Sequence, residues 1–250
     1  MRLAQPRVTT YGATTVVAHT VRHQIRWARR SPLPHAASDR EWALSRVGLV
    51  QFRELAVPGA IEFTPKIYPD ARGQFVAPFQ ESAFLDATGR RLQVAQSNHS
   101  VSQRGVIRGV HFCDVPPGQA KYLYCSRGAL LDIAIDVRVG SPAFGRWDAM
   151  RLDAQTYRAV YLPEGIGHAF IALTDDTVLT YLCSTGYDPA VEHTVSPLDP
   201  ALQLPWPADL EPILSDRDRA APTLAEAAQA GILPHWQTCQ TRYAQLHAVS

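Results

Sequence analysis

The chain reads Leu130-Leu131-Asp132-Ile133-Ala134-Ile135-Asp136-Val137 near its centre. This stretch is mostly apolar and includes β-branched residues, a composition that predicts a strand with both faces largely covered. Comparable short runs lie on either side of it, at 61–68, 74–79, 93–98, 121–126, 159–162, 168–173 and 178–183. Turn signals separate the runs, namely Asp70-Ala71-Arg72-Gly73, Pro116-Pro117-Gly118, Gly140-Ser141-Pro142 and Pro163-Glu164-Gly165. Regularly spaced short strands without alternating helices predict an all-β jelly roll.

The composition is that of an ordinary globular chain. Its 250 residues are 46% hydrophobic and 19% charged, with a formal net charge of +1. These proportions exclude a disordered or collagen-like chain, and the small net charge argues against a nucleic-acid-binding protein, which needs a concentrated positive surface. The sequence has no run of about 18 apolar residues and no signal-peptide pattern, and its four cysteines form no closely spaced pair. We therefore expect no membrane span and a cytoplasmic protein with free thiols.

Charge divides the chain into an arm and a body. Residues 1–48 contain eight arginines, one aspartate and one glutamate, for a net charge of +6, so the remainder carries −5. We interpret 1–48 as a basic N-terminal arm, either a flexible segment or one that contacts an anionic partner. Residues 49–222 form the predicted β domain. Residues 223–250 are expected to be a peripheral tail that begins with a short helix at 223–230.

A set of motifs follows in unbroken order between residues 50 and 222. The set consists of Asp70-Ala71-Arg72-Gly73, Gln96-Ser97-Asn98-His99-Ser100, Arg108-Gly109-Val110-His111-Phe112, Gln119-Ala120-Lys121, Gly145-Arg146-Trp147, Pro163-Glu164-Gly165-Ile166-Gly167-His168, Trp206-Pro207 and Ser215-Asp216-Arg217-Asp218. It resembles the dTDP-4-dehydrorhamnose 3,5-epimerases and related dTDP-4-keto-6-deoxysugar epimerases of deoxysugar pathways. The resemblance implies a cupin jelly roll, a homodimer, and inversion of carbon centres beside the C4 ketone of a dTDP-linked sugar. It implies no cofactor, because the ketone already acidifies the neighbouring C–H bonds.

Cupins often hold a metal between two motifs, and only one of the two is intact in this sequence. The second motif is retained and ends in His168, whereas the first supplies a single histidine, His111, without a nearby glutamate. Two ligands are fewer than the three protein ligands that such a site needs. We therefore expect no metal.

The implied reaction needs a base, a group that stabilises an enolate, and an acid on the opposite face of the sugar. By the resemblance, His111 is the base and Asp218 is its carboxylate partner, with Asp216 as the competing candidate. Tyr181 is the acid. Lys121 is the enolate stabiliser, and it is one of only two lysines among 24 basic residues, which indicates a position that needs a compact ammonium.

The resemblance also implies a set of substrate-binding residues. Arginines are expected to hold the diphosphate through charge-assisted hydrogen bonds, and an aromatic ring is expected to stack on the heterocyclic base of the nucleotide. The set comprises Arg72 and Arg108 for the diphosphate, Phe75 for the nucleotide base, Gln96, Asn98 and His168 for hydrogen bonds, and Tyr187 for the sugar.

The sequence departs from rhamnose-pathway members at positions that the resemblance places around the substrate. Phe112-Cys113 stands where Tyr-Gln is usual, and Ala77, Tyr124 and Leu182 replace Glu, Arg and Lys. Such changes resemble the antibiotic-pathway branch, whose members act at C3, at C5 or at both. Two alternatives stay open: a 4-ketosugar isomerase on the same fold, and a sugar-nucleotide-binding cupin without catalysis.

Overall fold

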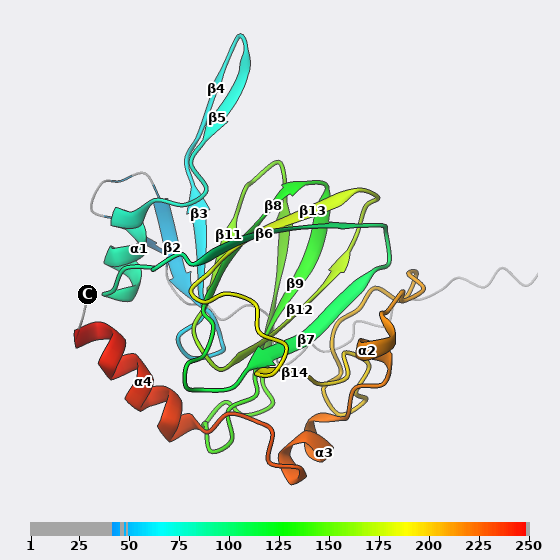
Figure 1. The fold of residues 1–250 in the computed structure, drawn as a ribbon. Coiled ribbons are helices and arrows are strands. Elements are labelled where there is room, and N and C mark those ends of the chain that lie inside the picture. The colour runs from blue at the N-terminus through cyan, green and yellow to red at the C-terminus, as the bar shows by residue number, and fades with distance from the viewer. Residues whose placement is uncertain (1–41, 46–47, 49, 249–250) are drawn as a thin grey trace, which may run out of the picture. The chain divides into compact units, whose positions relative to one another are not determined.

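Two antiparallel sheets make up most of the structure, a computed structural model that describes residues 42–45, 48 and 50–248 (Figure 1). All of these residues belong to one unit that spans 34–250. The predicted basic arm at 1–48 lies largely outside the described residues.

The larger sheet has seven strands in the order β1-β2-β3-β11-β8-β13-β6. Every neighbouring pair in it is antiparallel. Its strands are β1 (Ala43–Leu44), β2 (Val50–Glu54), β3 (Ile61–Pro65), β6 (Gln96–Ser102), β8 (Lys121–Arg127), β11 (Ala159–Leu162) and β13 (Thr177–Cys183).

The smaller sheet has five antiparallel strands in the order β10-β9-β12-β7-β14. The apolar run at 130–137 becomes β9, which lies between two neighbours and is buried along nearly its whole length. The strands are β7 (Ile107–Cys113), β9 (Ala129–Asp136), β10 (Trp147–Asp153), β12 (Ile166–Ala172) and β14 (Glu192–Thr194).

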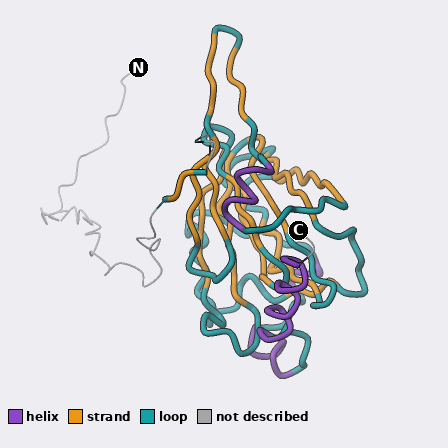
Figure 2. Tube along the Cα trace, turned by 90° about the vertical axis from the view of Figure 1, so that its left-hand side faces the viewer, coloured by secondary structure: helices purple, strands orange, loops and turns teal. Residues whose placement is uncertain are grey.

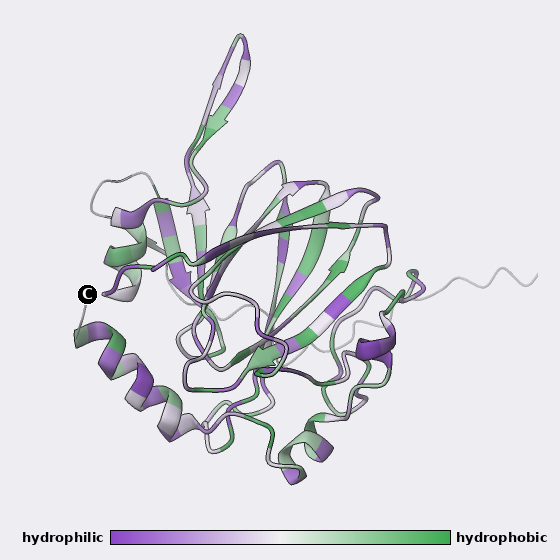
Figure 3. Ribbon diagram, viewed as in Figure 1, coloured by the Kyte–Doolittle hydropathy of each residue, from purple (hydrophilic) through white to green (hydrophobic). Residues whose placement is uncertain are grey.

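The two sheets face each other across a shared apolar core. Successive strands from β6 to β14 mostly alternate between the sheets, which is the connectivity of a jelly roll. Apolar and polar residues alternate along several strands (Figure 3), so each sheet turns apolar side chains inward. Core residues come from both sheets, among them Leu123, Cys125, Leu130, Leu152, Phe170 and Leu179. The predicted all-β jelly roll is confirmed.

A separate hairpin projects from the sheets in the ribbon view and in the tube view turned by 90° (Figure 1, Figure 2). It consists of β4 (Ile67–Asp70) and β5 (Gly73–Val76), paired antiparallel. Gly73 closes its turn with φ at 131°, a conformation that residues with a side chain rarely adopt. The Asp70 carboxylate accepts hydrogen bonds from the backbone N–H and the guanidinium of Arg72, which fixes the tip.

The described residues also form four helices, α1 (Glu81–Thr88), α2 (Asp216–Arg219), α3 (Leu224–Gln229) and α4 (Trp236–Ala248). The predicted helix at 223–230 is α3, which begins after Thr223 with a capping box to Glu226. Leu224 and Ala227 pack into the core beside the smaller sheet, and α4 buries Cys239. The domain boundary at 222 stays a prediction. None of these described helices is long and apolar enough to cross a membrane.

Candidate active site

A cavity of about 210 Å³ lies between the two sheets. Three strands of the larger sheet (β6, β8, β13) and three of the smaller one (β7, β12, β14) contribute side chains to it. Most of these side chains are polar. The lining residues are Gln96, Asn98, Ser100, Arg108, His111, Gln119, Lys121, His168, Phe170, Leu179, Tyr181, Tyr187 and Glu192.

His111 and Asp218 form a close pair at this cavity. Nε2 of His111, on β7, lies 2.7 Å from Oδ1 of Asp218 on α2. Helix α2 holds the aspartate in place because its N-cap, Ser215, accepts a hydrogen bond from the Asp218 backbone N–H at 3.1 Å. The competing candidate, Asp216, is exposed on the same helix. The structure therefore brings Asp218, and not Asp216, to the histidine.

The surroundings of Asp218 keep its carboxylate charged. Burial by itself would raise its pKa, but hydrogen bonds from His111 and Ser215 and from the Gly109 backbone N–H outweigh burial and hold the pKa below its usual value. A carboxylate that accepts the Nε2–H of His111 leaves the Nδ1 lone pair available. The pair thus has the arrangement of a general base with an orienting partner.

Lys121 begins strand β8 and reaches the cavity with only 9% of its surface exposed. Within the described residues its ammonium has no ion pair with a carboxylate. Two buried thiols lie nearby: burial raises the pKa of Cys113 to about 11 and also raises that of Cys183, and the charge of Lys121 lowers both to a smaller extent. The ammonium is therefore a partly desolvated cation that is available to an anionic oxygen.

Tyr181 faces the cavity from the opposite sheet. It lies on β13, directly across the ladders from Asn98 on β6 and Leu123 on β8. Burial raises the pKa of its phenol, so the hydroxyl stays protonated. His111 and Tyr181 thus belong to different sheets and line one cavity between them.

A second histidine–aspartate pair lies beside the first. His168 is the register partner of His111 across β12 and β7, and its Nε2 lies 2.7 Å from Oδ2 of Asp132. Asp132 is fully buried, and its Oδ1 has no hydrogen-bond partner among the described residues. In the part of the chain that the structure describes, no three His, Cys, Asp or Glu side chains are grouped to hold a metal ion.

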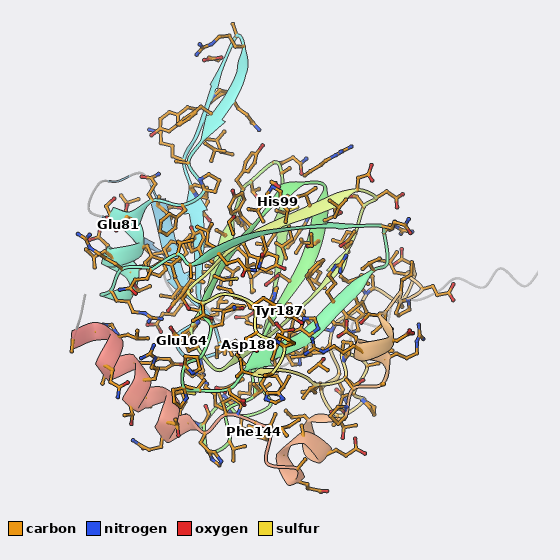
Figure 4. The ribbon with its side chains drawn as sticks, viewed as in Figure 1. Glu81, His99, Phe144, Glu164, Tyr187 and Asp188 are labelled. Atoms are coloured by element: carbon orange, nitrogen blue, oxygen red, sulfur yellow. The ribbon has the colours of Figure 1, made fainter. Side chains whose placement is uncertain are left out.

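Arg108 and Tyr187 lie on two further parts of the cavity wall. The guanidinium of Arg108 donates to Ser102 Oγ at 3.2 Å and to the Val101 carbonyl at 3.3 Å. Tyr187 and Asp188 belong to the loop between β13 and β14 (Figure 4), and Tyr187 is 58% exposed. Both predicted binding residues therefore keep accessible surface for a ligand.

Two predicted binding residues do not line the cavity of their own chain. Arg72 and Phe75 are on the projecting hairpin, where the Arg72 side chain is 90% exposed and Phe75 is 67% exposed. Arg72 pairs with Asp70 at 2.6 Å. On this chain alone, the two residues are separate from the remaining predicted site.

The positions at which the sequence departs from rhamnose-pathway members do not line this cavity, so their expected place around the substrate stays a prediction. Phe112 points away from His111 into the core beside the smaller sheet, while Tyr124 and Leu182 pack into a cluster on the other face of the larger sheet. Side chains alternate along a strand, so neighbours of pocket residues face the opposite way. Cys113 lines only an adjoining cavity, which shares Gln119 and Glu192 with the main one.

Three polar lining residues were absent from the sequence prediction. Gln119 precedes Lys121, Ser100 continues the alternating row on β6, and Glu192 lies on the short strand β14. Glu192 accepts a hydrogen bond from Arg217 at 2.9 Å. The period of two along 96–100 is a signal that could have identified Ser100, whereas β14 is too short to carry such a signal.

Comparison with known proteins gives one consistent family. The family described as dTDP-4-dehydrorhamnose 3,5-epimerase matches residues 54–226. A protein of that name from Mycolicibacterium smegmatis is 53% identical over 188 residues, covering 75% of this chain and 92% of its own. A dTDP-4-dehydro-6-deoxyglucose 3-epimerase from Streptomyces bikiniensis is 53% identical over 186 residues, covering 74% and 95%. The crystal structure of the 3'-monoepimerase ChmJ from Streptomyces bikiniensis in complex with dTDP-quinovose is 50% identical with a TM-score of 0.76, covering 78% and 98%.

Proposed function

Because the chain belongs to the dTDP-4-dehydrorhamnose 3,5-epimerase family, we propose that it inverts C3, C5 or both carbons of a dTDP-4-keto-6-deoxyhexose in deoxysugar biosynthesis. The observation that carries this proposal is the placement of His111 and Tyr181 on facing sheets of one cavity that also holds Lys121. A base, an acid and an ammonium in one cavity favour catalysis over simple binding of a sugar nucleotide.

In the proposed reaction, Nδ1 of His111 removes the proton from a carbon beside the ketone. Asp218 accepts the Nε2–H at 2.7 Å, which fixes the tautomer with a free Nδ1 lone pair. The imidazolium that forms lies against a carboxylate whose pKa is below its usual value, so the charge created by proton removal is compensated at once.

The electron pair of the broken C–H bond moves into the ketone and gives an enolate oxygen. Lys121 supplies the positive charge for that oxygen, and its shielding from solvent strengthens the attraction. No cofactor takes part in the proposed step, because the C4 ketone itself receives the electrons.

Inversion requires that a second proton be delivered to the other face of the same carbon. Tyr181 approaches from the opposite sheet, and its raised pKa keeps the phenolic proton in place until the carbanionic carbon takes it. The ketone re-forms with one centre inverted, and at that point His111 holds the abstracted proton while Tyr181 is a phenolate. His111 then loses a proton to solvent and Tyr181 takes one up, which restores the site, and an enzyme that acts at both carbons repeats the cycle at the second one.

We also propose a homodimer in which the hairpin completes the site of a second copy. Arg72 and Phe75 project from their own chain, so a role in nucleotide binding needs a cavity other than their own. Mixing a hairpin variant with a His111→Ala variant tests this arrangement. One site of a mixed dimer receives both intact parts, and the mixture is expected to show more exchange activity than either parent at substrate concentrations below saturation.

The proposed location is the cytoplasm. All four cysteines are free and buried, and a reducing compartment keeps thiols in that state.

Deuterium exchange tests the proposed function. The protein is incubated with dTDP-4-keto-6-deoxyglucose in deuterium oxide, and NMR shows whether C3, C5 or both take up deuterium. His111→Ala is expected to abolish exchange, whereas His99→Ala, on the exposed face of β6, keeps the wild-type rate. Absence of exchange in the wild type contradicts epimerase activity on this sugar, and movement of the ketone to another carbon supports the isomerase alternative.

A further inference from the structure

Strand β6 presents a row of three polar side chains to the cavity. Gln96, Asn98 and Ser100 are two residues apart, so they share one face of the strand, and all three line the cavity. The first two are engaged with protein groups. Gln96 Nε2 donates to Asn98 Oδ1 at 2.7 Å, Gln96 Oε1 accepts from the Tyr187 N–H at 2.8 Å, and Asn98 Nδ2 lies 3.6 Å from Cys183 Sγ.

Ser100 is the exception in this row. Its Oγ is shielded from solvent and has no hydrogen-bond partner among the described residues. Its register partner is Leu179, and Phe170 lines the same cavity, so these apolar side chains offer it neither donor nor acceptor. Shielded hydroxyls are almost always hydrogen-bonded, since leaving one unpaired is unfavourable. The hydroxyl is therefore poised for a molecule that enters the cavity.

The register shows which end of the cavity Ser100 occupies. Lys121 pairs with Cys183, and Cys183 pairs with Gln96, so the ammonium is at the Gln96 end of the row. Ser100 is four residues further along β6, which is roughly 13 Å of extended strand. The Ser100 hydroxyl therefore lies toward the opposite end of the cavity from Lys121.

Arg108 occupies the same end as Ser100. Its guanidinium donates to Ser102 Oγ and to the Val101 carbonyl, the two residues that follow Ser100 on β6. In a pyranose ring, C4 and C1 lie across the ring from each other. A ketone held at Lys121 consequently directs the C1 diphosphate toward Arg108 and Ser100.

We propose that the Ser100 hydroxyl donates a hydrogen bond to an oxygen of the substrate diphosphate, next to Arg108. A hydroxyl and a guanidinium together suit an anionic oxygen, because hydrogen bonds to charged acceptors are stronger than neutral ones. This inference rests on the proposed function and adds to it a residue that holds the anionic end of the substrate.

Binding of dTDP, which has the diphosphate but no sugar, tests the inference by isothermal titration calorimetry. Ser100→Ala is expected to weaken dTDP binding about tenfold or more, the range of a lost hydrogen bond to a charged group. Ser100→Thr keeps a hydroxyl and is expected to stay closer to the wild type. Ser97→Ala is the matched control, because Ser97 lies on the same strand with its side chain on the exposed face.

Several results would overturn the inference. Equal dTDP affinity in Ser100→Ala and the wild type shows that Ser100 does not contact the diphosphate. Unchanged dTDP affinity with weaker binding of a dTDP-sugar or slower exchange shows that Ser100 contacts the sugar instead. Equal losses in Ser97→Ala and Ser100→Ala indicate a general disturbance of β6. If the wild type itself binds no dTDP, the proposed function fails together with this inference. If the wild type binds dTDP and Ser100→Ala binds it equally well, only this inference fails, so the two failures are distinguishable.

Discussion

Replacing Asp218 with asparagine is the sharpest test of the proposed base. The amide has nearly the same shape as the carboxylate, so the packing around this buried residue is retained. However, the carboxylate receives hydrogen bonds from both the Gly109 N–H and His111, and asparagine has only one oxygen to offer. If that oxygen serves Gly109, the NH2 group faces Nε2 of His111. The imidazole must then accept at Nε2 and carry its proton on Nδ1.

The expected loss follows from this reversal of the tautomer. A histidine protonated on Nδ1 has no lone pair for the substrate, and its imidazolium form loses the adjacent negative charge. In the Ser-His-Asp template the corresponding change lowers the rate about 10⁴-fold. We expect a fall of about 10³- to 10⁴-fold in the rate of deuterium exchange, equivalent to about 4–5.5 kcal/mol in the barrier. The affinity for dTDP should not change, because Asp218 does not line the substrate cavity.

The assay compares Asp218→Asn with Asp216→Asn, which places the same substitution on an exposed position of the same helix. Exchange is followed by NMR in deuterium oxide, and nitrogen-15 NMR reads the tautomer of His111 directly. The reasoning is refuted if Asp218→Asn exchanges within tenfold of the wild type, or if its His111 keeps the proton on Nε2 while exchange is lost. Equal impairment of Asp216→Asn would point to a disturbed α2.

Three further predictions concern stability and binding. Gly109→Ala should lower the free energy of unfolding, measured in urea, by more than about 3 kcal/mol. Gly109 has φ at 115°, and an added Cβ would lie against the His168 carbonyl oxygen. A loss of unfolding free energy below about 1 kcal/mol contradicts this prediction. Asp218 has a lowered pKa, so its stabilising effect is complete above the usual value of 3.8 and is lost as the pH falls through the lower folded value. The stability difference between wild type and Asp218→Asn should therefore stay constant above about pH 5 and shrink as the pH falls below that value, and a difference that stays constant at acid pH would be inconsistent with the shift. Arg72→Ala and Phe75→Ala should each weaken dTDP binding about tenfold without changing the thermal midpoint of unfolding, since both side chains are exposed. Unchanged dTDP affinity in both variants would show that the hairpin takes no part in the binding site.

The fold was predictable where the pattern was local. The apolar run that became β9 was predicted to be a covered strand, and the helix predicted at 223–230 is α3. Helices α1 and α4 were not predicted. Helix α4 buries only Cys239 and carries no continuous apolar stripe, so its position depends on tertiary contacts such as the hydrogen bond between Tyr243 and Arg138.

The candidate site was predictable to the extent that motifs carry it. The structure brings His111, Lys121 and Tyr181 to one cavity and places Asp218 against the histidine. The roles of these residues stay proposals. What the sequence could not supply was direction: Phe112 follows His111 immediately, yet the alternation of the strand turns it into the core.

The hairpin positions of Arg72 and Phe75 could not be judged from sequence either. A motif shows that a residue belongs to a family pattern, but it does not show which copy of the chain the residue serves. Exposure of both side chains became visible only with the backbone path of β4 and β5.

The distribution of His111 and Tyr181 over two sheets has a consequence for how this enzyme class can change. The distance between the two groups is set by the apolar layer that separates the sheets, in which Leu179 and Phe170 lie. Selection can therefore alter which carbon of the sugar meets both groups by exchanging one aliphatic or aromatic side chain for another of different volume. Under the proposed roles, such a route leaves every polar residue of the cavity in place, so two chains with the same polar residues need not invert the same carbon.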